Sequence, residues 1–197
     1  MKSKNSIPLI ILISLIAVLN IVGCKKEQPI AMTGATLLAD VVLPPETDTY
    51  DVLGEISGIK GYIIKYSDKI YRGGDILSED GMKYLKDQGI TGIVSVSPTD
   101  LERNLAKQYE IEIFEAEFEK KPLDKKLVQN ALAFIEQTQG PVYIHCHSGC
   151  HRGGIICCAY RIHQENWPID KATVEFGRLG GCLKEDFQML ESINTLN

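Results

Sequence analysis

Apolar and polar residues follow two different periods along the chain from about residue 60 onward. Short continuous blocks rich in Ile, Val and Tyr are typical of buried strands, whereas apolar residues three or four positions apart are typical of helices packed on a core. Residues 153–164 are apolar nearly all round, which predicts a helix buried at the centre of the fold. Residues 127–135 show the helical spacing, with one apolar face made of Leu127, Val128, Ala131, Leu132 and Ile135.

Capping and breaking residues set the ends of the expected elements. Ser78 and Thr99 are typical helix N-caps, and Gly89 is a typical residue after a helix end. Strands that alternate with helices predict a single α/β domain with a mostly parallel central sheet flanked by helices. We expect extended segments at 62–64, 70–71, 91–95, 111–118 and 142–144, and helices at 78–89, 99–109, 124–138, 153–164, 168–179 and 184–196.

The N-terminus has the pattern of an exported lipoprotein. Lys2 and Lys4 precede an apolar run over residues 7–19, which is typical of a signal peptide, with an uncleaved membrane anchor as the alternative. Residues 21–24 (Ile-Val-Gly-Cys) resemble the bacterial lipobox, which implies that Cys24 is lipidated and becomes the first residue of the mature chain. The lipid would hold the protein to a bacterial membrane in the cell envelope, outside the cytoplasm.

These patterns divide the chain into three parts. We expect a lipoprotein signal peptide at 1–23, a tether that leads into the domain at 24–59, and the folded domain at 60–197.

Composition narrows the class of protein further. The chain has 197 residues, of which 44% are hydrophobic and 24% are charged. These fractions exclude a disordered chain, a collagen-like repeat and a coiled coil, and the length fits one domain. The formal net charge of -5 argues against a nucleic-acid partner. The six cysteines are too few and too clustered for a disulfide scaffold.

The densest chemistry lies in residues 145–154, which read His-Cys-His-Ser-Gly-Cys-His-Arg-Gly-Gly between a predicted strand and a predicted helix. A loop in that place points backbone N–H groups at one spot beside a positive helix N-terminus, which makes a site for phosphate. Cys146 is the first residue of the loop. The positive potential of the N–H groups and the helix N-terminus favours its thiolate form, which is a nucleophile. Arg152 can grip two phosphate oxygens with its guanidinium group, and Gly149 lets the loop curl.

This segment resembles the signature His-Cys-x-x-Gly-x-x-Arg of the cysteine-based protein tyrosine phosphatases. Residues 71–74 (Tyr-Arg-Gly-Gly) are similar to the opening of many small dual-specificity-like domains. Residues 122–167 resemble the atypical dual-specificity phosphatases of plants and fungi, some of which act on inositol pyrophosphates. The resemblance implies that residues 60–197 are a tyrosine or dual-specificity phosphatase-like domain.

The resemblance also implies an activity and the residues that carry it. The activity is hydrolysis of phosphate monoesters through a phosphocysteine, with no metal or other cofactor. Cys146 would be the nucleophile, and His145 would tune its thiolate. The phosphate would be bound by the residues that follow, which are His147, Ser148, Gly149, Cys150, His151 and Arg152.

Two departures from the family pattern affect the expected chemistry. The family usually has Ser or Thr after the arginine, where a hydroxyl helps the thiolate leave. Gly153 stands there in this chain, so we expect slow breakdown of the phosphoenzyme. No Trp-Pro-Asp loop is visible in the sequence. The acid that protonates the leaving oxygen therefore has three candidates, which are Glu117, Glu119 and Asp124. Asp124 matches the register of the atypical subgroup and suits a helix N-cap equally well, and Glu119 is the next candidate.

Other interpretations of the same segment stay open. Five of its residues are zinc-ligand types, although a second ligand pair is missing and Arg152 would repel the ion. Without turnover, the domain would be a phosphate-binding module. The five residues are His145, Cys146, His147, Cys150 and His151.

The remaining cysteines also have two interpretations. Cys150 is either a resolving thiol for an oxidised Cys146 or a small core or loop residue. The second interpretation is the simpler one for Cys157, Cys158 and Cys182 as well.

A group of lysines bears on the substrate. Lys120, Lys121, Lys125 and Lys126 surround Asp124 at a helix start, where cations oppose the helix dipole. They form either a rim for a multiply charged substrate or a solvated basic turn. The family resemblance implies a phosphorylated protein as the substrate, phosphotyrosine first, and a lysine rim would favour the alternative, an inositol polyphosphate.

Overall fold

The computed structural model describes residues 44, 47–118 and 123–196. The predicted signal peptide, Cys24 and most of the predicted tether lie outside this part of the chain, so the lipid anchor stays a prediction. No helix within the described residues is long and apolar enough to cross a membrane.

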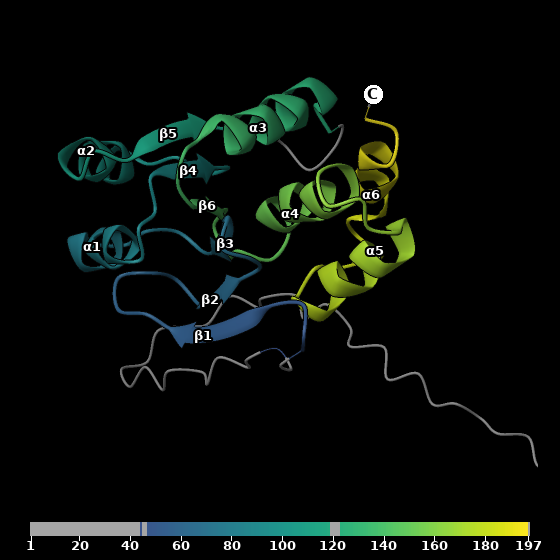
Figure 1. Ribbon diagram of the computed structural model, residues 1–197, viewed down its shortest axis with the longest axis horizontal. Coiled ribbons are helices and arrows are strands. Elements are labelled where there is room, and N and C mark those ends of the chain that lie inside the picture. The colour runs from purple at the N-terminus through teal and green to yellow at the C-terminus, as the bar shows by residue number, and fades with distance from the viewer. Residues whose placement is uncertain (1–43, 45–46, 119–122, 197) are drawn as a thin grey trace, which may run out of the picture. The chain divides into compact units, whose positions relative to one another are not determined.

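The fold is built on a six-stranded sheet with the strand order β1-β2-β3-β6-β4-β5 (Figure 1). The neighbours from β3 to β5 in this order are parallel, and β1 and β2 add an antiparallel edge. This arrangement confirms the predicted α/β domain with a mostly parallel sheet. The strands are β1 (Asp51–Glu55), β2 (Tyr62–Lys65), β3 (Ile70–Gly73), β4 (Gly92–Ser95), β5 (Glu112–Glu115) and β6 (Val142–His145).

Helices cover both faces of this sheet. Helices α1 (Glu79–Asp87) and α2 (Asp100–Gln108) share one hydrophobic cluster with one face, whereas α3 (Lys125–Gln137) and α4 (Arg152–His163) share a second cluster with the other. Successive strand residues enter opposite clusters, as Tyr143 and Ile144 do in β6, because side chains alternate across a strand. Helices α5 (Ile169–Arg178) and α6 (Phe187–Ile193) pack against α4.

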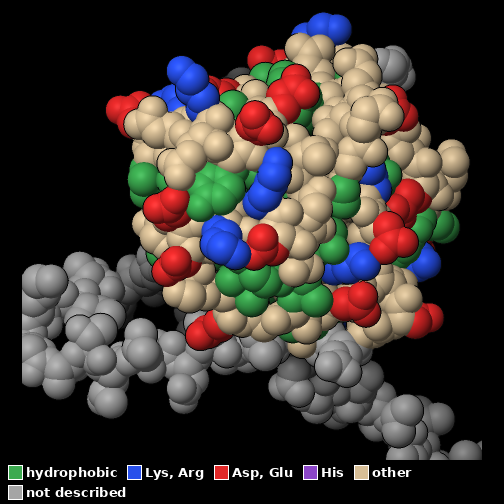
Figure 2. Space-filling view, turned by 60° about the vertical axis from the view of Figure 1, so that its left-hand side comes forward, with side chains coloured by type: hydrophobic (Ala, Val, Ile, Leu, Met, Phe, Trp, Pro, Cys, Tyr) green, Lys and Arg blue, Asp and Glu red, His purple; other side chains and the backbone are tan. Residues whose placement is uncertain are grey.

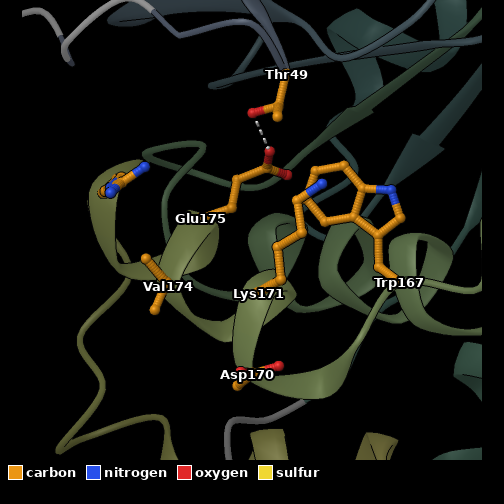
Figure 3. Close-up of a pocket in the computed structure, with 7 residues that line it drawn as sticks. Thr49, Trp167, Asp170, Lys171, Val174 and Glu175 are labelled. Atoms are coloured by element: carbon orange, nitrogen blue, oxygen red, sulfur yellow. Dashed lines mark hydrogen bonds between the residues drawn. The ribbon is translucent and has the colours of Figure 1, made fainter.

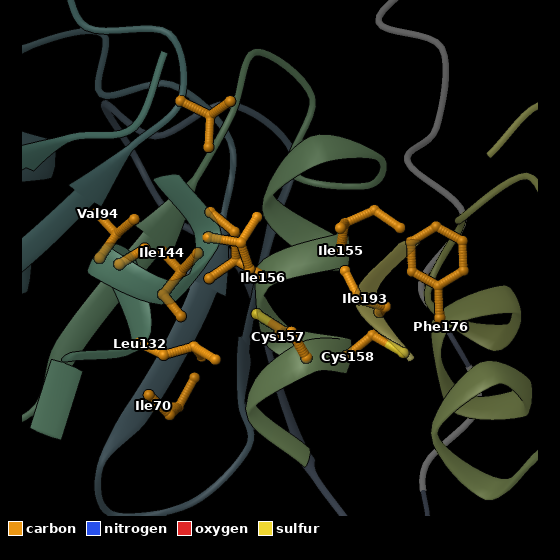
Figure 4. Packing of buried hydrophobic residues seen from close by; sticks show 14 of the residues in the cluster. Ile70, Val94, Leu132, Ile144, Ile155, Ile156, Cys157, Cys158, Phe176 and Ile193 are labelled. Atoms are coloured by element: carbon orange, nitrogen blue, oxygen red, sulfur yellow. The ribbon is translucent and has the colours of Figure 1, made fainter. Parts of the chain in front are cut away.

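Helix α4 lies at the centre of the larger cluster, as its apolar sequence predicts. Ile155 and Ile156 are fully buried, and the helix lies between Ile144 on the sheet and Phe176 on α5 (Figure 4). Burial of a side chain of this size stabilises a fold by roughly 1.5–3 kcal/mol. The start of α4, and with it the loop that follows β6, is therefore held from several sides.

Two helix ends differ from the sequence predictions. Ser78 precedes α1, but its side chain makes no capping hydrogen bond, whereas Thr99 accepts one from the Glu102 amide at 3.1 Å. The last helix spans 187–193 and not 184–196. The buried carboxylate of Asp186 accepts a hydrogen bond from the Cys182 amide at 3.0 Å, and this side-chain bond favours a turn before the helix.

Charges of both signs are interspersed on the face shown in Figure 2. Arg103 contacts Glu115 at 2.6 Å and Asp100 at 2.9 Å, and Lys83 contacts Asp87 at 2.6 Å. Exposed pairs of this kind contribute little to stability because water screens them, so the stability of the domain rests mainly on its buried clusters.

Candidate active site

The segment 146–151 forms a loop between the end of β6 and the start of α4. Cys146 is 2% exposed, and its carbonyl accepts a hydrogen bond from the Gly149 amide at 3.1 Å. Within the described residues, the amides of His147, Ser148, Cys150 and His151 donate no hydrogen bond to the protein. These N–H groups lie in the loop before the N-terminus of α4, and their binding of an anion stays a prediction.

Gly149 is required by the close approach of this loop to β3. Its φ is +74°, and a Cβ atom there would lie 2.5 Å from the carbonyl carbon and oxygen of Gly73. No larger residue fits this position without moving the backbone.

Arg72 on β3 binds the loop through its backbone carbonyl groups. This side chain on β3 is 1% exposed, and its guanidinium group donates to the carbonyl oxygens of Gly149 and Leu179, both at 2.5 Å, and to the Tyr66 hydroxyl at 2.7 Å. Charged hydrogen bonds in a buried place are stronger than neutral ones. Arg72 therefore fixes the loop against β3 and the end of α5, a role that sequence analysis did not assign to it.

Arg152 stands at the first position of α4, at the opposite end of the loop from Cys146. It is half-buried, and its guanidinium group donates to the Phe118 carbonyl at 3.2 Å. Phe118 directly precedes Glu119, one of the acid candidates. Arg152 thus connects the loop to the segment that leads to that acid.

His145 is buried between two carboxylates. Its Nε2 lies 2.6 Å from Glu102 Oε1, and its Nδ1 lies 3.6 Å from Asp75 Oδ1. Burial lowers the pKa of His145, but Asp75 and Glu102 together outweigh this and raise it to about 9. The residue before Cys146 is therefore an imidazolium at neutral pH, next to the predicted thiolate.

This raised pKa predicts how stability depends on pH. Since the pKa is about 9 in the folded chain against an ordinary 6.5, the contribution of His145 is fully present below pH 6.5 and is lost as pH rises through 9. We expect the free energy of unfolding, measured with urea, to fall by about 3 kcal/mol over this range. Glu102→Gln should flatten the dependence. An unfolding free energy that stays constant from pH 6.5 to 9 would contradict the assignment.

The two histidines of the loop itself have different acidic partners. His147 is exposed, and its Nδ1 lies 2.7 Å from Asp75 Oδ2. His151 Nδ1 lies 2.6 Å from Asp186 Oδ2, which ties the loop to the turn before α6. Among the described residues, no group of three or more His, Cys, Asp or Glu side chains is arranged to hold a metal ion.

The cysteines near the loop differ in their surroundings. Burial raises the pKa of Cys157 and of Cys158 to about 12, which fits neutral thiols packed in the core, as the simpler interpretation of them predicts. The half-buried Cys150 directs its Sγ to the Ser148 carbonyl oxygen at 3.4 Å. Its role as a resolving thiol stays a prediction.

The acid candidates and the predicted lysine rim are placed only in part. Asp124 is exposed and accepts a hydrogen bond from the Leu127 amide at 3.0 Å, so it caps α3, and Glu117 is also exposed. Lys125 donates to the Thr195 hydroxyl at 2.6 Å, near the C-terminal end of α6. Glu119, Lys120 and Lys121 lie outside the described residues.

A separate hollow of about 240 Å³ lies along α5 (Figure 3). Trp167 forms one wall, with the Lys171 ammonium 3.6 Å and the Arg161 guanidinium 4.2 Å from its ring centre. None of the residues that line it belongs to the loop 146–151.

Comparisons with known proteins agree with this arrangement. The family model "Dual specificity phosphatase, catalytic domain" matches residues 71–194. TpbA of P. aeruginosa has a similar structure, with a TM-score of 0.64 and 18% identity over 77% of this chain and 92% of TpbA. The catalytic core of the PP-IP phosphatase SIW14 of S. cerevisiae gives 0.53 and 18% over 79% of this chain and 88% of its own. No curated protein sequence matches the chain.

Proposed function

The chain belongs to the dual-specificity phosphatase family, and from this premise we propose that it hydrolyses phosphate monoesters through a phosphocysteine at Cys146. The proposal is supported by the loop 146–151, which begins at the buried Cys146, leads to the half-buried Arg152, and has four amides without a protein acceptor among the described residues.

The proposed reaction has two steps. The Cys146 thiolate attacks phosphorus, the bond to the leaving oxygen breaks, and an acid, Asp124 or Glu119, protonates that oxygen. Water then attacks phosphorus, the carboxylate left in the first step takes its proton, and the P–S bond breaks, so that Cys146 leaves as a thiolate and inorganic phosphate is released. The loop amides and Arg152 hold the phosphoryl oxygens in both steps, and Arg72 keeps the loop in place.

A phosphorylated protein is the substrate we rank first, with phosphotyrosine ahead of phosphoserine. One of the similar structures is TpbA in complex with pTyr, whereas SIW14 is described as a PP-IP phosphatase, so an inositol phosphate is the alternative. The proposal includes attachment to a membrane through lipidated Cys24, which rests on the sequence alone.

Parallel assays test the proposal. Phosphate release is measured from a phosphotyrosine peptide, a phosphoserine peptide and inositol phosphates, with a chelator present. We expect turnover of the phosphotyrosine peptide. Absence of release from every substrate, together with a phosphorylated Cys146, would favour a phosphate-binding module without turnover.

Gly153 predicts a slow second step. Its missing Cβ would lie 3.2 Å from the His145 carbonyl carbon and 3.3 Å from the Cys146 amide nitrogen, so a hydroxyl on a serine here would lie close to the nucleophile. We expect a burst of product in the native protein and a smaller burst in Gly153→Ser, because a well-placed hydroxyl stabilises the leaving thiolate by roughly 1–3 kcal/mol.

Gly153→Ala is the matched control, since it adds the same Cβ without the hydroxyl. It should keep the native burst. An equal decrease in both variants would assign the effect to the tight contact, and a native protein without a burst would show that the second step is not limiting.

A further inference from the structure

Besides the buried Arg72, a lysine from outside the family signature reaches the phosphate-binding loop. Lys60 lies in the segment 56–61, between β1 and β2. Its amide donates to the Asp75 carbonyl at 2.9 Å, and Ile59 forms an isolated bridge with Ile76. The backbone of Lys60 is therefore fixed beside the segment that packs against the loop.

The side chain of Lys60 extends this contact to the loop itself. Its Nζ lies 2.6 Å from His147 Nε2, and His147 directly follows Cys146. Burial raises the pKa of Asp75, but the nearby His145 and the hydrogen bonds from Ser97 and His147 outweigh it and hold that pKa well below its usual range. Asp75 is thus ionised and accepts a hydrogen bond from His147 Nδ1, so that Nε2 accepts one from the Lys60 ammonium.

This arrangement leaves the charge of Lys60 without a carboxylate of its own. Within the described part of the chain, Lys60 forms no ion pair, and its contact is with an imidazole nitrogen of His147. An anion at the edge of the loop would be a stronger partner for the ammonium than that imidazole. Lys125, in contrast, is directed to Thr195.

We propose that Lys60 is a specificity-determining residue that binds a second phosphate of the substrate, next to the phosphate held by the loop. The proposal rests on the proposed function and favours its alternative substrate, an inositol phosphate, over a phosphotyrosine peptide, which carries one phosphate. His147, held by Asp75, positions the ammonium when no substrate is bound. The shared chemistry is a second phosphate, either bonded to the first as a diphosphate or carried on a neighbouring ring position.

Binding of two simple anions tests this without turnover. In the full chain with Cys146→Ser, titration calorimetry at neutral pH measures the affinities for inorganic phosphate and inorganic pyrophosphate. Pyrophosphate should bind more tightly, and adding Lys60→Gln should weaken it by about three- to tenfold while phosphate changes less than about twofold. Lys60→Arg should retain most of the pyrophosphate affinity.

Lys83→Gln is the matched control, because Lys83 is an exposed lysine on α1 paired with Asp87. It should leave both affinities unchanged. Unchanged pyrophosphate binding in Lys60→Gln, or equal weakening of both anions, would overturn the proposal. The proposal would also be overturned if the Cys146→Ser protein with native Lys60 bound pyrophosphate no more tightly than phosphate. That result does not depend on how a Lys60 variant folds.

The active enzyme separates the two sources of a second phosphate. Lys60→Gln should lower kcat/KM for inositol hexakisphosphate, but not for p-nitrophenyl phosphate, if neighbouring ring phosphates are recognised. If Lys60→Gln weakens the binding of pyrophosphate but leaves kcat/KM for inositol hexakisphosphate unchanged, the site recognises diphosphates. Failure of turnover in the native protein would contradict the proposed function and leave the binding result intact.

Discussion

Replacing Cys146 by serine is expected to lower kcat by about 10⁴-fold or more, because residues that form the covalent bond have effects of this size. A serine alcohol does not ionise near neutral pH, so the nucleophile is lost. The side chain is 2% exposed and the replacement is nearly isosteric, so the fold should be kept. Release of p-nitrophenol measures the loss, and circular dichroism checks the fold.

The same variant distinguishes the phosphatase mechanism from a metal site. Phosphate should still bind to it, because the loop amides and Arg152 are unchanged. Activity that survives in Cys146→Ser and disappears with a chelator would contradict the mechanism and support the metal interpretation.

Arg152→Lys is expected to lower kcat/KM by about 10²–10³-fold, because one ammonium cannot replace a guanidinium group that binds two oxygens at once. Lysine keeps the positive charge at position 152, so a lower kcat/KM would result from the changed geometry of the cation and not from a change in net charge. Initial rates on p-nitrophenyl phosphate measure it.

Arg103→Lys is the control for this substitution. Arg103 is exposed and pairs with Glu115 and Asp100, away from the loop. It should keep the native kcat/KM. Full activity in Arg152→Lys would show that this guanidinium group does not hold the phosphoryl oxygens.

The fold was predictable where local periodicity and tertiary burial agree. The all-apolar pattern of 153–164 corresponds to the buried helix α4, and Thr99 caps α2 as expected. β1 was hidden in the predicted tether, because a register shift between Val52 and Gly54 breaks its alternation and neither of its ends is buried. Pairing with β2, the next strand along the chain, makes it a strand.

The candidate site was predictable only along one contiguous segment. The nucleophile Cys146, Gly149 and Arg152 lie within seven consecutive residues, so their spacing alone indicates a phosphate site. Arg72, Glu102 and Lys60 reach it through the parallel sheet and its connections, from positions 43 to 87 residues away from their partners. Such contacts depend on the strand order, which no local pattern encodes.

Detection of the covalent intermediate shows whether Cys146 is the nucleophile. The native protein is mixed with p-nitrophenyl phosphate, quenched in acid during the first turnovers, digested and analysed by mass spectrometry. We expect a peptide in which Cys146 carries one phosphoryl group, appearing with the burst of product and absent from Cys146→Ser. Continued release of phosphate while Cys146 stays unmodified at every time point would contradict it.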